Sequence, residues 1–118
     1  MARLATGAAN SMLGAAFTGT QYLSLHTADP GTTGGSEVTG GSYARQSITW
    51  NAASSGTQTS SNAQNFTGMP ATTIGYFGIW SASTAGTYLG GGTVGGVTTV
   101  PSGSTVAFAS AAVSLTVS

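Results

Sequence analysis

The sequence predicts an all-β protein, an antiparallel β-sandwich or jelly roll of about seven to eight short strands with a short N-terminal helix. Runs in which apolar and polar residues alternate recur along the 118-residue chain, and this period is that of a half-buried strand. Segments rich in Gly, Pro, Ser and Asn separate the runs and provide turns. A chain of this length is expected to form one domain, which excludes a multidomain enzyme.

The N-terminal region is the one stretch of sequence in which apolar residues recur at helical spacing. Gly7 and Gly14 each weaken a helix by about 1 kcal/mol relative to Ala, so this helix must dock on another surface. We expect it to close one end of the β domain; the alternative is an arm inserted into a neighbouring subunit. The predicted division is a helix or arm at 1–20 and a single β-sandwich domain at 21–118.

Two strands are predicted in the first half of the β domain. Residues 21–26 place Leu23 and Leu25 on one face, and the turn sequence TADPG ends this strand because Pro fixes φ and Gly permits positive φ. A long loop rich in Thr, Gly and Ser follows. Residues 43–50 then alternate cleanly, which predicts a strand with one face exposed.

The middle of the chain predicts a loop or irregular edge followed by a central strand. Residues 51–62 are polar and of low complexity, which favours a loop or an irregular edge. Residues 72–80 form the most hydrophobic run, with Phe77 and Ile79 on one face, and Gly78 allows another segment to approach closely.

The C-terminal part predicts a hairpin-like return and several short strands. The return is expected at 86–89, and the glycine-rich segment 90–96 is expected to be too flexible to be ordered by itself. Leu115 and Val117 are expected to occupy the buried face of the last strand. The remaining strands are predicted at 64–66, 97–100, 106–108 and 113–118.

The predicted core is thin. Leu, Ile, Val and Phe together make 20 of the 118 residues, yet the net charge is zero, so the composition favours a folded chain over a disordered one. A thin core and an almost uncharged surface favour self-association, and we expect a homo-oligomer, most simply a trimer. The predicted core residues are Leu23, Leu25, Phe77, Ile79, Leu115 and Val117.

The charged residues are only four: Arg3, Asp29, Glu37 and Arg45. Two basic side chains cannot neutralise several phosphates, so nucleic acid and anionic membranes are not expected partners. Cysteine is absent, and no stretch approaches the length of a membrane-spanning helix. We therefore expect a soluble protein that is made in the cytoplasm and not processed.

No catalytic, cofactor or metal site is predicted. His26 is the only candidate base, and a hydrogen bond at the end of a strand accounts for it. A metal would have to draw on His26, Asp29 and Glu37, whose spacing resembles no EF-hand. The sequence GGGTVG matches the dinucleotide pattern, but no βαβ unit surrounds it.

Arg45 is the sole basic residue of the β region, and burial without a partner would be costly. We expect an ion pair with Asp29 or Glu37 that holds the intervening loop. Six aromatic residues could form a sugar-stacking platform, although packing in the core or between subunits is the favoured interpretation. They are Tyr22, Tyr43, Trp50, Tyr76, Phe77 and Trp80.

Four sequence blocks carry a resemblance to a known family. They are YLSLHTADPG at 22–31, EVTGGSYAR at 37–45, IGYFGIW at 74–80 and VPSGSTVAF at 100–108. With them the chain resembles, from residue 21 onward, a family of small tailed-bacteriophage proteins labelled tail-fibre-like or minor tail proteins. The resemblance implies a non-enzymatic virion protein, made in the host bacterial cytoplasm, whose partners are other virion proteins.

The resemblance leaves more than one role open. The first is a structural protein of the tail or fibre that packs against other virion subunits. The alternative is a capsid decoration protein that stabilises the head, and a lesser alternative is a carbohydrate-binding receptor module. A hydrolase is nearly excluded by the residues available.

Overall fold

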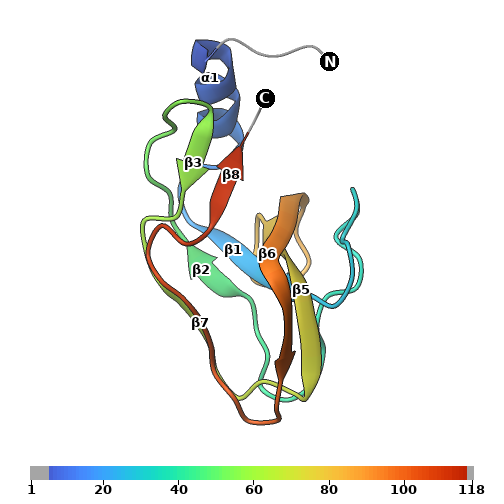
Figure 1. Ribbon diagram of the computed structural model, residues 1–118. Helices are drawn as coiled ribbons and strands as arrows, with labels where there is room; N and C mark the ends of the chain where they lie inside the picture. The colour runs from blue at the N-terminus through green and yellow to red at the C-terminus, as the bar shows by residue number, and fades with distance from the viewer. Residues whose placement is uncertain (1–5, 117–118) are drawn as a thin grey trace.

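The computed structural model describes residues 6–116, and it confirms a mainly β, sandwich-like fold with one short helix near the N-terminus (Figure 1). The described part extends over about 44 × 28 × 25 Å. In chain order the elements are α1 (Thr6–Ala16), β1 (Gln21–His26), β2 (Gln46–Ile48), β3 (Thr57–Thr59), β4 (Gln64–Phe66), β5 (Thr72–Trp80), β6 (Tyr88–Val100), β7 (Val106–Phe108) and β8 (Ser114–Thr116).

The main sheet has four antiparallel strands in the order β2-β1-β5-β6. Its two inner strands, β1 and β5, each begin and end where the sequence predicts. Their register places Leu23 opposite Ile79 and Leu25 opposite Phe77. These four side chains share one face because alternate residues of a strand point the same way.

Two short antiparallel ribbons, β3-β8 and β4-β7, form the second layer. The chain passes from the sheet to the ribbons just after β2, where Trp50 bridges to Ser60. The backbone N–H of Ser60 in turn donates to the carbonyl of Val113, at 2.9 Å. The second layer is therefore joined to the sheet along the β2 side.

Helix α1 lies at one end of the molecule, beside the β3-β8 ribbon (Figure 1). Leu13, a residue of this helix, is buried, whereas its neighbour Met12 is 54% exposed. Glutamine amides satisfy the carbonyls at its C-terminal end: Gln21 donates to Ala16 at 2.9 Å and Gln58 donates to Phe17 at 2.8 Å. The helix thus sits against its own β domain.

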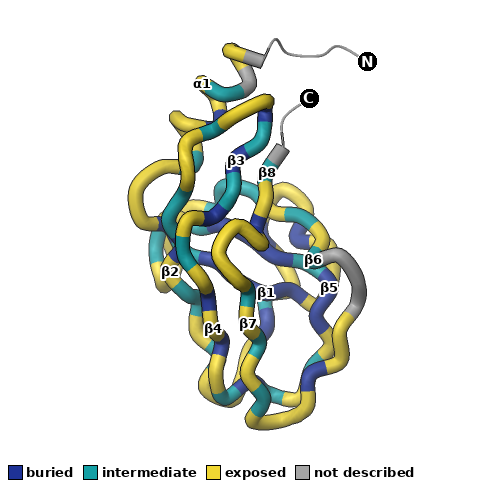
Figure 2. Tube along the Cα trace, turned by 60° about the vertical axis from the view of Figure 1, so that its left-hand side comes forward, coloured by how far each residue is buried: buried dark blue, intermediate teal, exposed yellow. Residues whose placement is uncertain are grey.

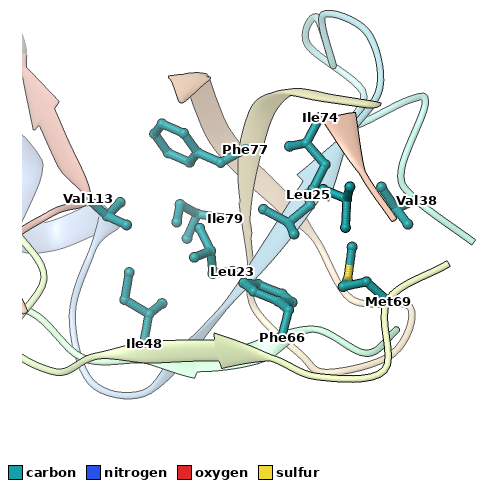
Figure 3. Packing of buried hydrophobic residues seen from close by; sticks show 11 residues of the cluster. Leu23, Leu25, Val38, Ile48, Phe66, Met69, Ile74, Phe77, Ile79 and Val113 are labelled. Atoms are coloured by element: carbon teal, nitrogen blue, oxygen red, sulfur yellow. The ribbon is translucent and has the colours of Figure 1, made fainter. Parts of the chain in front are cut away.

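The apolar core lies between the sheet and the ribbons, and its buried stretches are prominent in β1 and β5 (Figure 2). Leu23, Leu25, Phe77 and Ile79 belong to one buried cluster (Figure 3), and Leu115 packs against it while partly exposed. Val117 lies outside the described residues. The cluster also contains Val38, Ile48, Phe66, Met69, Ile74, Val100 and Val113.

Two sequence predictions need correction, those for 51–62 and 43–50. The expected loop at 51–62 contains β3, whose Gln58 is 3% exposed although its neighbours in the sequence are polar. The glycine-rich segment 90–96, which was not expected to be ordered by itself, lies inside β6: residues 90–93 pair with β5, and the register then shifts, so that pairing resumes at Thr98. The strand predicted at 43–50 is confined to β2. Within residues 6–116, no helix has the length and apolar composition that crossing a membrane requires.

Candidate functional site

Arg45 is the centre of the most extensive polar network in the described part of the chain. Its Nε and Nη2 donate to the two carboxylate oxygens of Glu37, at 2.9 and 2.8 Å. Its Nη1 donates to the carbonyls of Ala82 and Ala85, at 3.1 and 2.9 Å. The guanidinium carbon lies 3.8 Å from the centre of the Trp80 ring. We call Arg45 with these partners the Arg45 hub.

The Arg45 hub is largely withdrawn from water, since the Arg45 and Glu37 side chains are 10% and 22% exposed. A planar guanidinium bound to a carboxylate by two parallel hydrogen bonds is the strongest common form of ion pair. Burial by itself would raise the pKa of Glu37, but hydrogen bonds from Arg45 and Tyr43 outweigh it and hold this pKa below its ordinary value.

Tyr43 connects the hub to β1. Its hydroxyl donates to Oε2 of Glu37 at 2.8 Å and accepts from the backbone N–H of Leu25 at 3.0 Å. Burial raises the pKa of Tyr43, so the hydroxyl stays protonated and can donate. Its ring stacks on Phe66 with 5.9 Å between ring centres, which ties the hub to the apolar core.

The loop after β1 folds back along that strand and delivers Glu37. Glu37 forms an isolated bridge with His26, and the N–H of Val38 donates to the carbonyl of Leu25 at 2.9 Å. At Gly34, where φ is +78°, a Cβ atom would lie 2.6 Å from the Trp80 ring. Glycine is required there both by the backbone conformation and by this close approach.

A chain of side-chain hydrogen bonds runs under the same loop. The indole N–H of Trp80 donates to Oγ of Ser24 at 2.8 Å, and Oγ of Ser24 lies 2.7 Å from Nε2 of His26. Nδ1 of His26 lies 2.7 Å from the carbonyl oxygen of Gly35. Because a carbonyl only accepts, Nδ1 carries the proton; Nε2 then accepts from the serine hydroxyl.

The Ser24–His26 pair is sealed within the protein. Both residues are 0% exposed, and Gly78 supplies the space for them: a Cβ atom there would lie 2.7 Å from Oγ of Ser24 and 2.8 Å from Nε2 of His26. Burial lowers the pKa of His26, which favours the neutral imidazole that the hydrogen bonds require. A hydroxyl and an imidazole at this distance resemble a nucleophile and its base. Here, however, both groups are buried, and their other hydrogen bonds are to Trp80 and to the carbonyl of Gly35.

The structure separates Asp29 from the ion pair. Asp29 is exposed in the turn after β1, where its carboxylate accepts from the N–H of Gly31 at 2.9 Å. This placement corrects the alternative in which Arg45 pairs with Asp29. Among residues 6–116, no three His, Asp or Glu side chains are grouped as ligands for a metal ion.

The six aromatic residues do not form one platform. Phe77 is in the core, Tyr43 stacks on Phe66, and Trp80 is covered by Arg45. Trp50 lies apart from these, with its ring edge-on to Phe17 at 5.6 Å between centres and its N–H bound to Gln21. Tyr22 and Tyr76 are half-buried on β1 and β5.

Sequence reasoning missed Ser24 and the tryptophan-to-histidine chain. Ser24 and His26 are two residues apart on one strand, so they share a face, and Gly78 is their neighbour on β5. A polar pair opposite a glycine was the available signal. This signal could be recognised only once the pairing of β1 with β5 was known.

The segments that build this network include the sequence blocks that resemble phage tail proteins. A comparison with curated proteins finds no match to the chain. A family model described as Podophage GP4 fiber I protein gp80 matches residues 3–116. Since this match spans nearly the whole sequence, the chain belongs to the family of the Podophage GP4 fiber I protein gp80.

Proposed function

We propose that the chain is a non-enzymatic structural component of a bacteriophage tail fibre and packs against other virion subunits. Membership of a phage fibre family supports a structural, tail-fibre-like role. The observation that carries the non-enzymatic part is that the polar side chains converge inward. Arg45 and Glu37 bind each other, and Ser24 and His26 bond to each other at 0% exposure.

In this proposal the Arg45 hub makes the domain rigid, although few large apolar side chains form its core. It joins the loop after β1, the end of β5 and the turn at 81–87 through one guanidinium. A rigid surface binds its neighbours without first paying the entropy of ordering its loops. The fold thereby presents a fixed surface to other virion proteins.

The family description favours a fibre over capsid decoration, because it names a fibre protein. A carbohydrate-binding receptor module has less support, since the candidate aromatic residues are dispersed and Trp80 is covered by Arg45. Host cytoplasmic synthesis and assembly with other virion proteins belong to the same proposal.

The copy number of the protein in purified virions tests the proposal. Quantitative mass spectrometry against the major capsid protein should give a handful to a few dozen copies per particle, and antibody labelling should place them on the tail. Hundreds of copies on the head would instead establish capsid decoration. Absence from purified particles would overturn a virion role altogether.

A further inference from the structure

Arg45 is the sole basic residue at positions 6–116, because the chain has no lysine and its other arginine, Arg3, lies outside the described part. Endopeptidases of the trypsin type recognise an arginine or lysine side chain, which they bind in a charged pocket. Within the described part these enzymes can therefore act at one position, the peptide bond between Arg45 and Gln46. The surroundings of this bond decide whether a protease reaches it.

The side chain that a protease has to bind is already engaged. Arg45 donates two hydrogen bonds to Glu37 and one each to the carbonyls of Ala82 and Ala85. Its guanidinium lies over the Trp80 ring, and its side chain is only 10% exposed. The pocket of a protease can accept this group only after the Arg45 hub has opened.

The backbone on both sides of the bond is held as well. Gln46 begins β2 and lies opposite Leu23 in the register with β1. Tyr43, two residues before Arg45, is bound through its hydroxyl to Glu37 and to the backbone of β1. Proteases cleave segments that have left the folded surface. Cleavage therefore requires this stretch to detach from β1.

The exposed turns, where proteolysis of folded proteins normally begins, carry no basic residue. The mainly exposed turns and loops are 27–36, 51–56, 81–87 and 101–104. Enzymes that require arginine or lysine find no recognition site in any of them. The accessible sites and the recognisable site are thus in different parts of the described chain.

We propose that the Arg45 hub shields a cleavage site, so that the folded protein resists arginine- and lysine-specific endopeptidases until the hub opens. In the cleavage itself, water adds across the Arg45–Gln46 peptide bond, leaving a carboxyl group on Arg45 and an amino group on Gln46, and the protease supplies the catalytic groups. This inference goes beyond the proposed function and does not depend on where the protein lies in the virion.

Opening of the hub leaves the inner strands paired. Its partners Glu37, Ala82 and Ala85 lie outside the strands, whereas β1 and β5 are joined along 22–26 and 76–80. Local openings of this kind require less free energy than global unfolding and expose less surface. We therefore expect cleavage to start from a folded molecule rather than from an unfolded one.

Trypsin digestion of the full chain, followed by mass spectrometry, tests the shielding. Ala52 is exposed between β2 and β3, so Ala52→Arg places an arginine on open surface. In this variant cleavage after position 52 should be at least about tenfold faster than cleavage after Arg45. Cleavage after Arg3 removes three residues and is recognised by its fragment mass. Equal rates after positions 52 and 45, whether fast or slow, would overturn the inference.

A second pair of variants tests the hub directly. Glu37→Gln removes the carboxylate charge that holds Arg45, and it should raise the rate of cleavage after Arg45 at least about tenfold. The matched control is Asp29→Asn, since Asp29 bonds to the N–H of Gly31 instead, and it should leave the rate unchanged. No increase with Glu37→Gln, or an equal increase with the control, would contradict the shielding.

A urea series on the unaltered protein tests the local opening without any substitution. Below the unfolding transition, the rate of cleavage after Arg45 should rise less steeply with urea than the global unfolding constant does, because less surface becomes exposed. Equal steepness would mean that cleavage requires global unfolding and would overturn the inference. Each of these results leaves the copy number and tail position of the protein in virions, and with them the proposed function, to be decided separately.

Discussion

The two faces of β1 and β5 are buried by different chemistry. On the core face, Leu23 and Leu25 meet Phe77 and Ile79 in an apolar cluster. On the opposite face, which we call the polar face, Ser24 and His26 lie under a folded-back loop held by the Arg45 hub. The core face needs only apolar residues at alternate positions. The polar face needs specific partners at specific atoms, so it is the more sensitive to small chemical changes.

The largest effect is expected on the core face. Phe77→Ala removes a side chain that is 7% exposed and packs in the apolar cluster. We expect a loss of about 3 to 5 kcal/mol in the free energy of unfolding, measured by chemical denaturation. A loss below about 1 kcal/mol would mean that neighbouring side chains relax into the vacated space and that the core does not depend on this ring.

The next largest effect is expected at the Arg45 hub. Arg45→Met leaves Glu37 partly buried without its partner, and we expect a loss of about 2 to 4 kcal/mol. A double-mutant cycle with Glu37→Gln should give a coupling energy above about 1 kcal/mol. The matched cycle with Asp29→Asn should give none. Equal coupling to both acids would show that the bidentate pair is not what holds the loop.

Gly78→Ala tests the space on the polar face. The added methyl group would lie 2.7 Å from Oγ of Ser24 and 2.8 Å from Nε2 of His26, and we expect a loss of about 1 to 3 kcal/mol. Gly90→Ala is the control on β6, since the nearest atom, in Phe17, is 3.7 Å away. If the two variants unfold at the same denaturant concentration, the polar face is not closely packed.

The smallest effect is expected from pH. The pKa of His26 is lowered by burial, so between that value and the ordinary pKa of about 6.5 the unfolded chain binds more protons than the folded chain. Stability should be complete above about pH 6.5 and fall as the pH is lowered below that value. His26→Gln should be less stable at neutral pH but lose this dependence. A parent protein that gains stability on acidification would contradict the neutral imidazole.

The core face could be predicted from the sequence because its signal is local. Alternation within β1 and β5 fixes both the bounds of the strands and the residues that face inward. β3 was missed because Thr57, Gln58 and Thr59 carry no large apolar side chain, and Gln58 is buried through hydrogen bonds to the carbonyls of Phe17 and Asn51. Such partners lie in other segments, so the local pattern does not reveal them.

The polar face could be predicted only in outline for the same reason. The sequence predicts an acidic partner for Arg45 because it is the sole basic residue of the β region. The choice between Asp29 and Glu37, however, depends on how the loop folds back. The start of β6 was likewise hidden, since Gly90, Gly91 and Gly92 have little strand preference of their own and are ordered by pairing with β5.

The span of the Arg45 hub along the chain has a kinetic consequence. Arg45 bonds to carbonyls 37 and 40 positions away, so we expect these contacts to form only after β1 and β5 have paired. Contacts that form after the rate-limiting step of folding change the unfolding rate and leave the folding rate almost unaltered. Losing the hub should therefore shorten the lifetime of the folded subunit without delaying its formation. For the proposed role in a virus particle, that lifetime is the relevant measure of durability.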